Sequence, residues 1–171
     1  MRPIADFENV KASGEFEQLP PGGYVCAILK AEDVPDKEYL KIDFDIASGE
    51  FRSYFSNMQE RLGWNNGHFF RSYKEKAKGM FKAFTNAVEA SNSSYKWDWN
   101  EKGLAGLLIG LVLAEEEYKK NNGDIGTRLY VSAVKSVNDI EQDNFKVPAK
   151  RLIKEEPSPA GFEPLDNELP F

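Results

Sequence analysis

Chemically reactive residues are scarce in this sequence. Its 171 residues hold one cysteine, Cys26, and one histidine, His68. A single cysteine excludes an internal disulfide framework and fits a reducing cytoplasm. The chain therefore offers neither the ligand spacing of a zinc site nor a Cys–His pair for nucleophilic catalysis. Its glycines are scattered and form no phosphate-binding or dinucleotide fingerprint. We expect no enzymatic activity, no cofactor and no metal.

Long apolar runs are missing as well. The longest, Leu104 to Ala114, has 11 residues and is interrupted by glycines, whereas a membrane-spanning helix needs about 20. The segment Met1–Asp6 has neither the apolar core nor the cleavage pattern of a signal peptide. We expect a cytoplasmic protein with no membrane partner.

Basic charge is outweighed by acidic charge, but unevenly along the chain. The net charge is −6, and five acids without a base lie between Glu155 and Phe171. Without these five acids the net charge of residues 1–154 is −1. The body is therefore nearly neutral and able to carry a local basic face.

Apolar residues alternate in Tyr39–Ala47 and again in Arg128–Val137, and they recur at helical spacing in Ser72–Ala90. In Tyr39–Ala47 the apolar residues Leu40, Ile42, Phe44 and Ile46 fall on one face, which is the period of a half-buried strand. The turn Ser48–Glu50 leads into aromatic-rich Phe51–Asn57, so 39–57 is predicted to be a hairpin. Further strands are expected at Tyr24–Ala31, Leu107–Tyr118 and Arg128–Val137, with a helix at Ser72–Ala90.

The order of these elements is three strands, a helix and two strands. It predicts a mainly β domain with one main helix, a five-stranded OB-fold-like barrel, although other small α+β domains share this order. We expect a lead-in at 1–19, the OB-like domain at 20–153 and a flexible, disordered acidic tail at 154–171.

Aromatic residues make up 13% of the chain, and several alternate with basic residues. Rings that stack on bases and cations that follow phosphates are what single-strand binding needs. Alternation puts Tyr39 and Lys41 outside the core, with Arg52 and Tyr54 as their expected companions. The stretch Arg71–Lys82 holds five bases and one acid. The candidate DNA-binding residues are Tyr39, Lys41, Arg52, Tyr54, Arg71, Tyr73, Lys74, Lys78, Arg128 and Tyr130.

Plainer interpretations compete with each of these features. A lysine-rich helix face is often only a solvated face, and Trp64, Trp97 and Trp99 fit a cap on the barrel equally well. Asp43 and Asp45 share a strand face, which is compatible with a metal-dependent nuclease, although solvated strand acids are far commoner than metal sites.

The C-terminus favours recruitment of other proteins. A partner-docking peptide is expected from Asp166, Glu168, Leu169, Pro170 and Phe171. Phe171 offers a ring to bury and a free carboxylate for an arginine or lysine, and Pro170 lowers the ordering cost of binding. This ending resembles the acidic tip of bacterial single-stranded DNA-binding proteins, typically Asp-Asp-Asp-Ile-Pro-Phe. Here Asn167 replaces an acid and Leu169 replaces isoleucine. The resemblance implies docking onto replication, recombination and repair proteins.

The body carries a second resemblance. Phe70–Lys74, Tyr95–Asp98, Glu115–Tyr118 after Gly110, and Asn144–Pro148 resemble a family of small proteins encoded by phages and mobile elements of Gram-positive bacteria, over residues 14–171. The resemblance implies a phage single-stranded DNA-binding protein of the host cytoplasm. The body does not resemble the ordinary bacterial family, so no DNA contacts are carried over from it.

We therefore expect sequence-nonspecific binding that protects single-stranded DNA in phage replication and recombination, with partner proteins recruited by the C-terminal tip. The alternatives are an OB-fold adaptor that binds only proteins, a metal-dependent nuclease and a strand-annealing protein. The sequence leaves homo-oligomerisation open.

Overall fold

The alternating residues of 39–47 form the second strand of a five-stranded antiparallel sheet, with the order β3-β2-β1-β4-β5. The computed structural model describes residues 1–9, 18–63 and 67–153. The strands are β1 (Gly22–Val34), β2 (Tyr39–Ile46), β3 (Gly67–Ser72), β4 (Leu108–Lys119) and β5 (Ile125–Lys135). The helices are α1 (Tyr54–Leu62), α2 (Lys78–Ser91) and α3 (Val137–Glu141), with short 3-10 helices at Phe7–Asn9, Pro35–Lys37, Glu75–Ala77 and Glu101–Leu104. The predicted mainly β class is confirmed.

The long strand β1 joins the two halves of the sheet. Its residues 22–27 pair with β4, and its residues 26–34 pair with β2. A register shift between Ile28 and Lys30 leaves Leu29 as an extra residue, and such a bulge bends a strand. The edge strands β3 and β5 do not pair with each other among the described strands, so the sheet is open.

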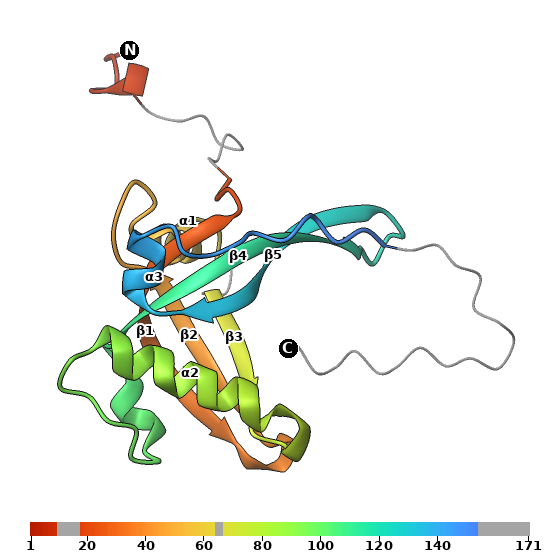
Figure 1. Cartoon of the computed structure of the whole chain (residues 1–171). Coiled ribbons are helices and arrows are strands. Elements are labelled where there is room, and N and C mark those ends of the chain that lie inside the picture. Colours follow the sequence, from red (N-terminus) through yellow and green to blue (C-terminus); the bar gives the residue numbers. More distant parts are fainter. Residues whose placement is uncertain (10–17, 64–66, 154–171) are drawn as a thin grey trace, which may run out of the picture.

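One face of the sheet and helix α2 enclose the core. Leu40, Ile42 and Phe44 are buried, as the alternation predicts. Phe81, Phe84 and Val88 recur at helical spacing and bury one side of α2, which lies across the lower part of the sheet (Figure 1). The predicted helix is confirmed, but it begins at Lys78 rather than Ser72, because β3 continues to Ser72 and a 3-10 helix follows.

The prediction of a hairpin over 39–57 is wrong. Residues 49–53 form turns and Tyr54–Leu62 is helix α1, while β2 pairs with β1 and β3. The carboxylate of Asp45 accepts hydrogen bonds from the backbone N–H groups of Phe55 and Ser56 at 3.0 and 3.1 Å. A β2 side chain thus satisfies donors in the first turn of α1, which need partners from outside the helix.

After α3 the chain runs back along the β4–β5 arm (Figure 1). Arg151 donates its backbone N–H to Glu115 and accepts one from Glu117, at 3.0 and 2.8 Å. Phe145 lies against Gly23, where an added Cβ would come within 2.5 Å of the ring. Phe145 thus packs on β1, and Arg151 forms an isolated parallel bridge with Glu116 of β4, while most of residues 142–153 are exposed.

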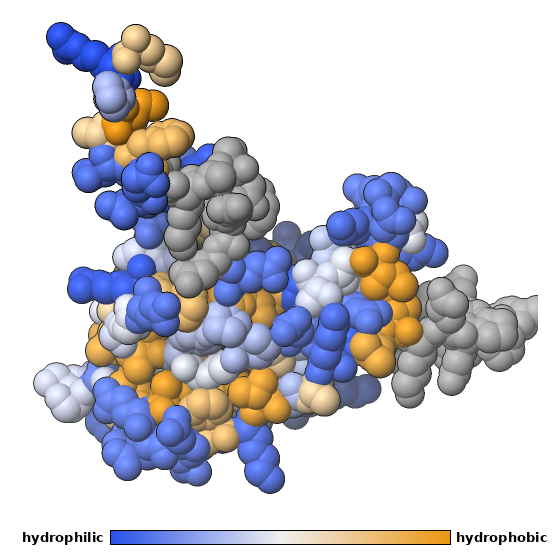
Figure 2. Space-filling view, turned by 90° about the horizontal axis from the view of Figure 1, so that it is seen from above, coloured by the Kyte–Doolittle hydropathy of each residue, from blue (hydrophilic) through white to orange (hydrophobic). Residues whose placement is uncertain are grey.

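None of the helices in the described ranges is both long enough and apolar enough to cross a membrane. Seen from above, hydrophobic side chains form several small groups with hydrophilic ones between them (Figure 2). Isolated apolar groups of this kind need no functional explanation.

Candidate nucleic-acid interface

Two aromatic rings and a lysine gather on the solvent side of β2 and β3. In the register of the two strands Lys41 lies opposite Phe70, and Asp43 lies opposite His68. Opposite residues of an antiparallel pair share a face, so these four side chains lie with Tyr39 on the face away from the core. We call these five residues the β2–β3 outer face. The Tyr39 and Phe70 rings meet edge to face at 4.8 Å, and the His68 ring lies 5.5 Å from Phe70.

Three more predicted residues, Tyr73, Lys74 and Lys78, lie between the end of β3 and the start of α2. Tyr39 pairs with Ser72, the last residue of β3, and Tyr73 and Lys74 come next. The Tyr73 ring meets Phe81 of α2 edge to face at 6.1 Å, and its hydroxyl donates to Asp33 at 2.8 Å. Burial and this hydrogen bond raise the pKa of Tyr73 to about 12. Lys78, exposed at the first position of α2, forms an ion pair with Glu75.

Arg71, the first base of the predicted patch, does not belong to this face. It lies opposite Leu40, its side chain is only 6% exposed, and its guanidinium lies 5.1 Å from the centre of the Phe69 ring. Nη1 donates to the carbonyl of Phe70 at 3.0 Å, and burial lowers the pKa of Arg71 to about 10. The expectation of an exposed Arg71 is wrong, because strand alternation turns it toward the core side.

Arg52 and Tyr54 are not companions of Tyr39 and Lys41. Both lie beyond the far end of β2: Arg52 is exposed in the turn before α1, and the backbone N–H of Ser53 donates to Ile46. The half-buried Tyr54 ring contacts the rings of Phe51 and Phe55 at 6.3 and 5.3 Å. The expected grouping fails because 51–57 is not a strand.

Arg128 and Tyr130 lie on β5, the edge of the sheet opposite β3. Arg128 donates from Nε to Glu116 at 2.9 Å and lies 4.9 Å from the Tyr118 ring centre. Arg151 covers the Tyr130 ring at 4.3 Å. Both predicted residues are therefore engaged in contacts on the β4–β5 arm, separate from the β2–β3 outer face.

Sequence reasoning missed Phe70 and His68 as site residues. The glycines and asparagines before and around His68 favour a loop and hide the alternation of the strand that begins at Gly67. The alternating exposure of Gly67–Ser72 follows from its pairing with β2, which sets His68 and Phe70 on one face and Phe69 and Arg71 on the other.

The two acids of β2, Asp43 and Asp45, differ in burial and in their contacts. Asp45 is buried, and its two oxygens accept from the backbone N–H groups of Ile46, Phe55 and Ser56 and from the Ser56 hydroxyl. Asp43 is half-buried and lies opposite His68. Asp43 and Asp45 therefore lie on the same face of β2, as expected, but the carboxylate of Asp45 is occupied as a cap for α1. Across the described ranges, no three His, Cys, Asp or Glu side chains gather as metal ligands would.

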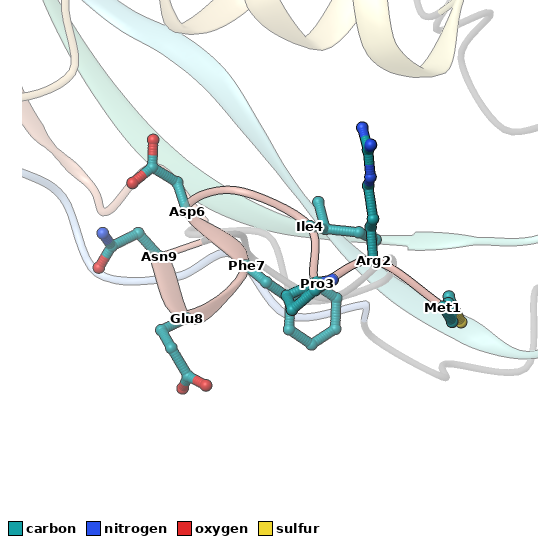
Figure 3. A pocket seen from close by; sticks show the side chains of 8 residues that line it. All are labelled: Met1, Arg2, Pro3, Ile4, Asp6, Phe7, Glu8 and Asn9. Carbon is teal, nitrogen blue, oxygen red and sulfur yellow. The ribbon is translucent and has the colours of Figure 1, made fainter.

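A hollow near the N-terminus is lined only by residues from Met1 to Asn9, all of them exposed. The charged side chains of Arg2, Asp6 and Glu8 extend away from one another (Figure 3). A ligand site needs a few convergent polar groups, so we assign no site to this hollow.

The predicted docking residues Asp166, Glu168, Leu169, Pro170 and Phe171 lie outside the described residues, as does Trp64. The chain matches no model of a known protein family, and no curated protein is similar to it by sequence.

Proposed function

We propose that this protein binds single-stranded DNA without strong sequence preference, through the β2–β3 outer face. The observation that carries the proposal is the Tyr39–Phe70 ring pair beside Lys41 on the exposed side of an open antiparallel sheet. Rings in such a position stack on bases of any sequence for about 1–3 kcal/mol each. Lys74 and Lys78, which follow β3, extend the cationic path that phosphates need.

The strand order supports an OB-type domain that is open between β3 and β5. An OB-fold is a five-stranded, partly open Greek-key barrel, and it binds oligonucleotides on the face of its second and third strands and on its 1–2 and 4–5 loops. Here the helix α2 lies between β3 and β4, and the corresponding loops are residues 35–38 and 120–124. The rings of Tyr39 and Phe70 lie on the second and third strands.

The wider role rests on the sequence. The resemblance to phage proteins supports protection of single-stranded DNA during replication and recombination, in the host cytoplasm. The terminal Leu169-Pro170-Phe171 supports recruitment of partner proteins by the tail. The hydrogen bonds of Asp45 to α1 weigh against a nuclease that uses this residue as a metal ligand.

The test is fluorescence anisotropy of labelled oligo-dT with the full chain and with residues 1–153, over a salt series. We expect tight binding that weakens steeply with salt and persists without the tail. Absence of binding by either protein at low salt would remove the proposal, and a protein-binding adaptor would replace it.

A matched pair of lysine and arginine variants localises the interface. Lys41→Ala removes a cation from the β2–β3 outer face, and Arg52→Ala removes an exposed cation from the turn beyond the other end of β2. Lys41→Ala is expected to weaken binding and to reduce by about one the magnitude of the slope of log binding constant against log salt concentration. Arg52→Ala is expected to bind like the wild type. Equal losses in the two variants would contradict the proposed face.

A further inference from the structure

Trp99 presents an indole ring to solvent from the connection between α2 and β4. The residue is 79% exposed. Its ring stacks on Phe81 of α2, with the planes inclined by 8° and the centres 6.5 Å apart. Trp97 meets both rings at steeper angles, at 5.9 Å from Phe81 and 5.7 Å from Trp99. Trp99 thus contacts Phe81 and Trp97 with a small part of its surface and leaves most of its flat apolar ring accessible.

The backbone at Trp99 has a conformation that a bulky residue seldom adopts. Trp99 has φ 64°, which is strained for any residue with a large side chain. The turn is fixed by side chains on both sides of it. The Asp98 carboxylate accepts from the N–H of Asn100 at 3.2 Å, and the Asn100 side chain accepts from Lys102 at 3.2 Å. These hydrogen bonds fix the backbone on either side of Trp99, which lowers the ordering cost when a planar ligand binds its exposed ring.

Several lysines lie at the start of α2, near Phe81 in the sequence. Phe81 lies between Lys78 and Lys82, which are one helical turn apart and therefore near each other on the surface of α2. Lys74 and Lys76 precede them with Glu75 as the one acid. Lys78 pairs with Glu75, and within the described ranges no ion pair engages the other three lysines. Next to Trp99 in the chain the acids Asp98 and Glu101 offset the bases Lys96 and Lys102, so the excess of positive charge that suits an anion lies at the start of α2.

We infer that Trp99 is a second base-stacking position for single-stranded DNA, with phosphates held by the lysines at the start of α2. A flat ring beside several cations fits a nucleotide, which joins a planar base to a phosphate. The position lies toward the Tyr39 end of the β2–β3 outer face, since Tyr73, next to the Tyr39 partner Ser72, also contacts Phe81. This inference rests on the proposed function and extends it to residues that pattern reasoning left as a barrel cap.

The test uses the full-length protein and oligo-dT, with tryptophan fluorescence and anisotropy measured together. In the wild type, stacking is expected to quench the emission of Trp99. Trp99→Phe retains a ring and removes the fluorophore, so it should bind within about threefold of the wild type but lose most of the quenching. Trp99→Ala should weaken binding by at least about fivefold. Leu152→Ala, which truncates another exposed apolar side chain, is the control and should bind like the wild type.

The outcomes separate this inference from the function on which it rests. If the wild type binds oligo-dT and Trp99→Ala binds as tightly, the stacking position is refuted while the proposed function stands. Equal losses in Trp99→Phe and Trp99→Ala would also refute it, because a ring at this position should suffice. If the wild type does not bind, both proposals fail. Urea denaturation of each variant distinguishes a loss of contact from a loss of folding.

Discussion

Replacement of Asp45 by alanine should destabilise the protein far more than the same change at Asp43, two residues away on the same strand. Asp45 is 5% exposed and accepts hydrogen bonds from the backbone N–H groups of Ile46, Phe55 and Ser56 at 2.8, 3.0 and 3.1 Å. It also accepts one from the Ser56 hydroxyl. Asp45→Ala would leave these donors without their charged acceptor.

The magnitude follows from the environment of each donor. A hydrogen bond to a charged group contributes about 1.5–3 kcal/mol, and loss of a helix cap costs about 1 kcal/mol. Ser56 is exposed, so water can replace part of what its donors lose, whereas Ile46 is buried. We therefore expect Asp45→Ala to lower the free energy of unfolding by about 3 kcal/mol. Asp43 is half-buried, and Asp43→Ala should cost less than about 1 kcal/mol.

Urea denaturation followed by circular dichroism measures both changes. With a slope near 2 kcal/mol per molar urea, the midpoint of Asp45→Ala should fall by about 1.5 M, with the slope unchanged. Asp45→Asn should lie between the two alanine variants, since its amide retains one oxygen acceptor. If the two alanine variants shift the midpoint equally, the reasoning that Asp45 caps α1 is refuted.

Three further predictions concern the packed interior. Gly23→Ala should destabilise the protein by about 1–3 kcal/mol, because its Cβ would lie 2.5 Å from the Phe145 ring; in a denaturation cycle, Phe145→Ala should relieve part of that cost. Cys26 is fully buried, and burial, followed by the charge of Asp45, raises the pKa of its thiol; an aromatic disulfide reagent should react with it only after denaturant is added. Burial is also the main cause that raises the pKa of Tyr24 and Tyr73 to about 12 from 10.0. Folding thus favours the neutral form of both tyrosines. Their contribution to the free energy of unfolding should be complete below pH 10 and lost as the pH rises toward 12. Ultraviolet titration would follow the ionisation, and urea denaturation at each pH would follow the loss of stability.

Strand β2 was predictable because its alternation is complete. Each apolar residue from Leu40 to Ile46 is buried, and Tyr39 and Lys41 remain half-exposed, as period-two patterning requires. The pattern of α2 was equally clear, since Phe81, Phe84 and Val88 repeat at helical spacing. In both elements one face is buried and most of the other meets solvent, with buried Asp45 as the exception on β2, and this contrast is what makes the periodicity visible in the sequence.

Helix α1 was missed although its spacing was present in the sequence. Phe51, Tyr54, Phe55 and Met58 follow one another at intervals of three, one and three residues, which places the last three on one side of a helix. The β preference of aromatic residues suggested a strand instead. What decides the matter is a distant contact: Asp45 on β2 caps the first turn, and Gly63 with φ 68° ends the helix.

The candidate site was only partly predictable, because the register of β2 and β3 decides on which face of the sheet each side chain lies. Counting bases put Arg71 in the same patch as Lys74 and Lys78. In a strand, however, neighbours point in opposite directions, and the pairing of Leu40 with Arg71 sends the guanidinium to the core side. The same pairing brings Phe70 out beside Tyr39. Composition therefore predicted the chemistry of the surface, while strand pairing determined which residues provide it.

The role of Phe81 shows why stability and binding must be measured together at the Trp99 position. Its ring contacts Phe84 in the core at 6.1 Å and also supports Trp99 on the surface. Removal of Phe81 would weaken both the fold and the contact with Trp99, so a loss of DNA binding in that variant could not be assigned to either cause. Trp99 itself contributes little buried area, being 79% exposed. A change at Trp99 that reduces affinity without shifting the urea midpoint can therefore be attributed to contact with the ligand, and that combination is what the stacking interpretation requires.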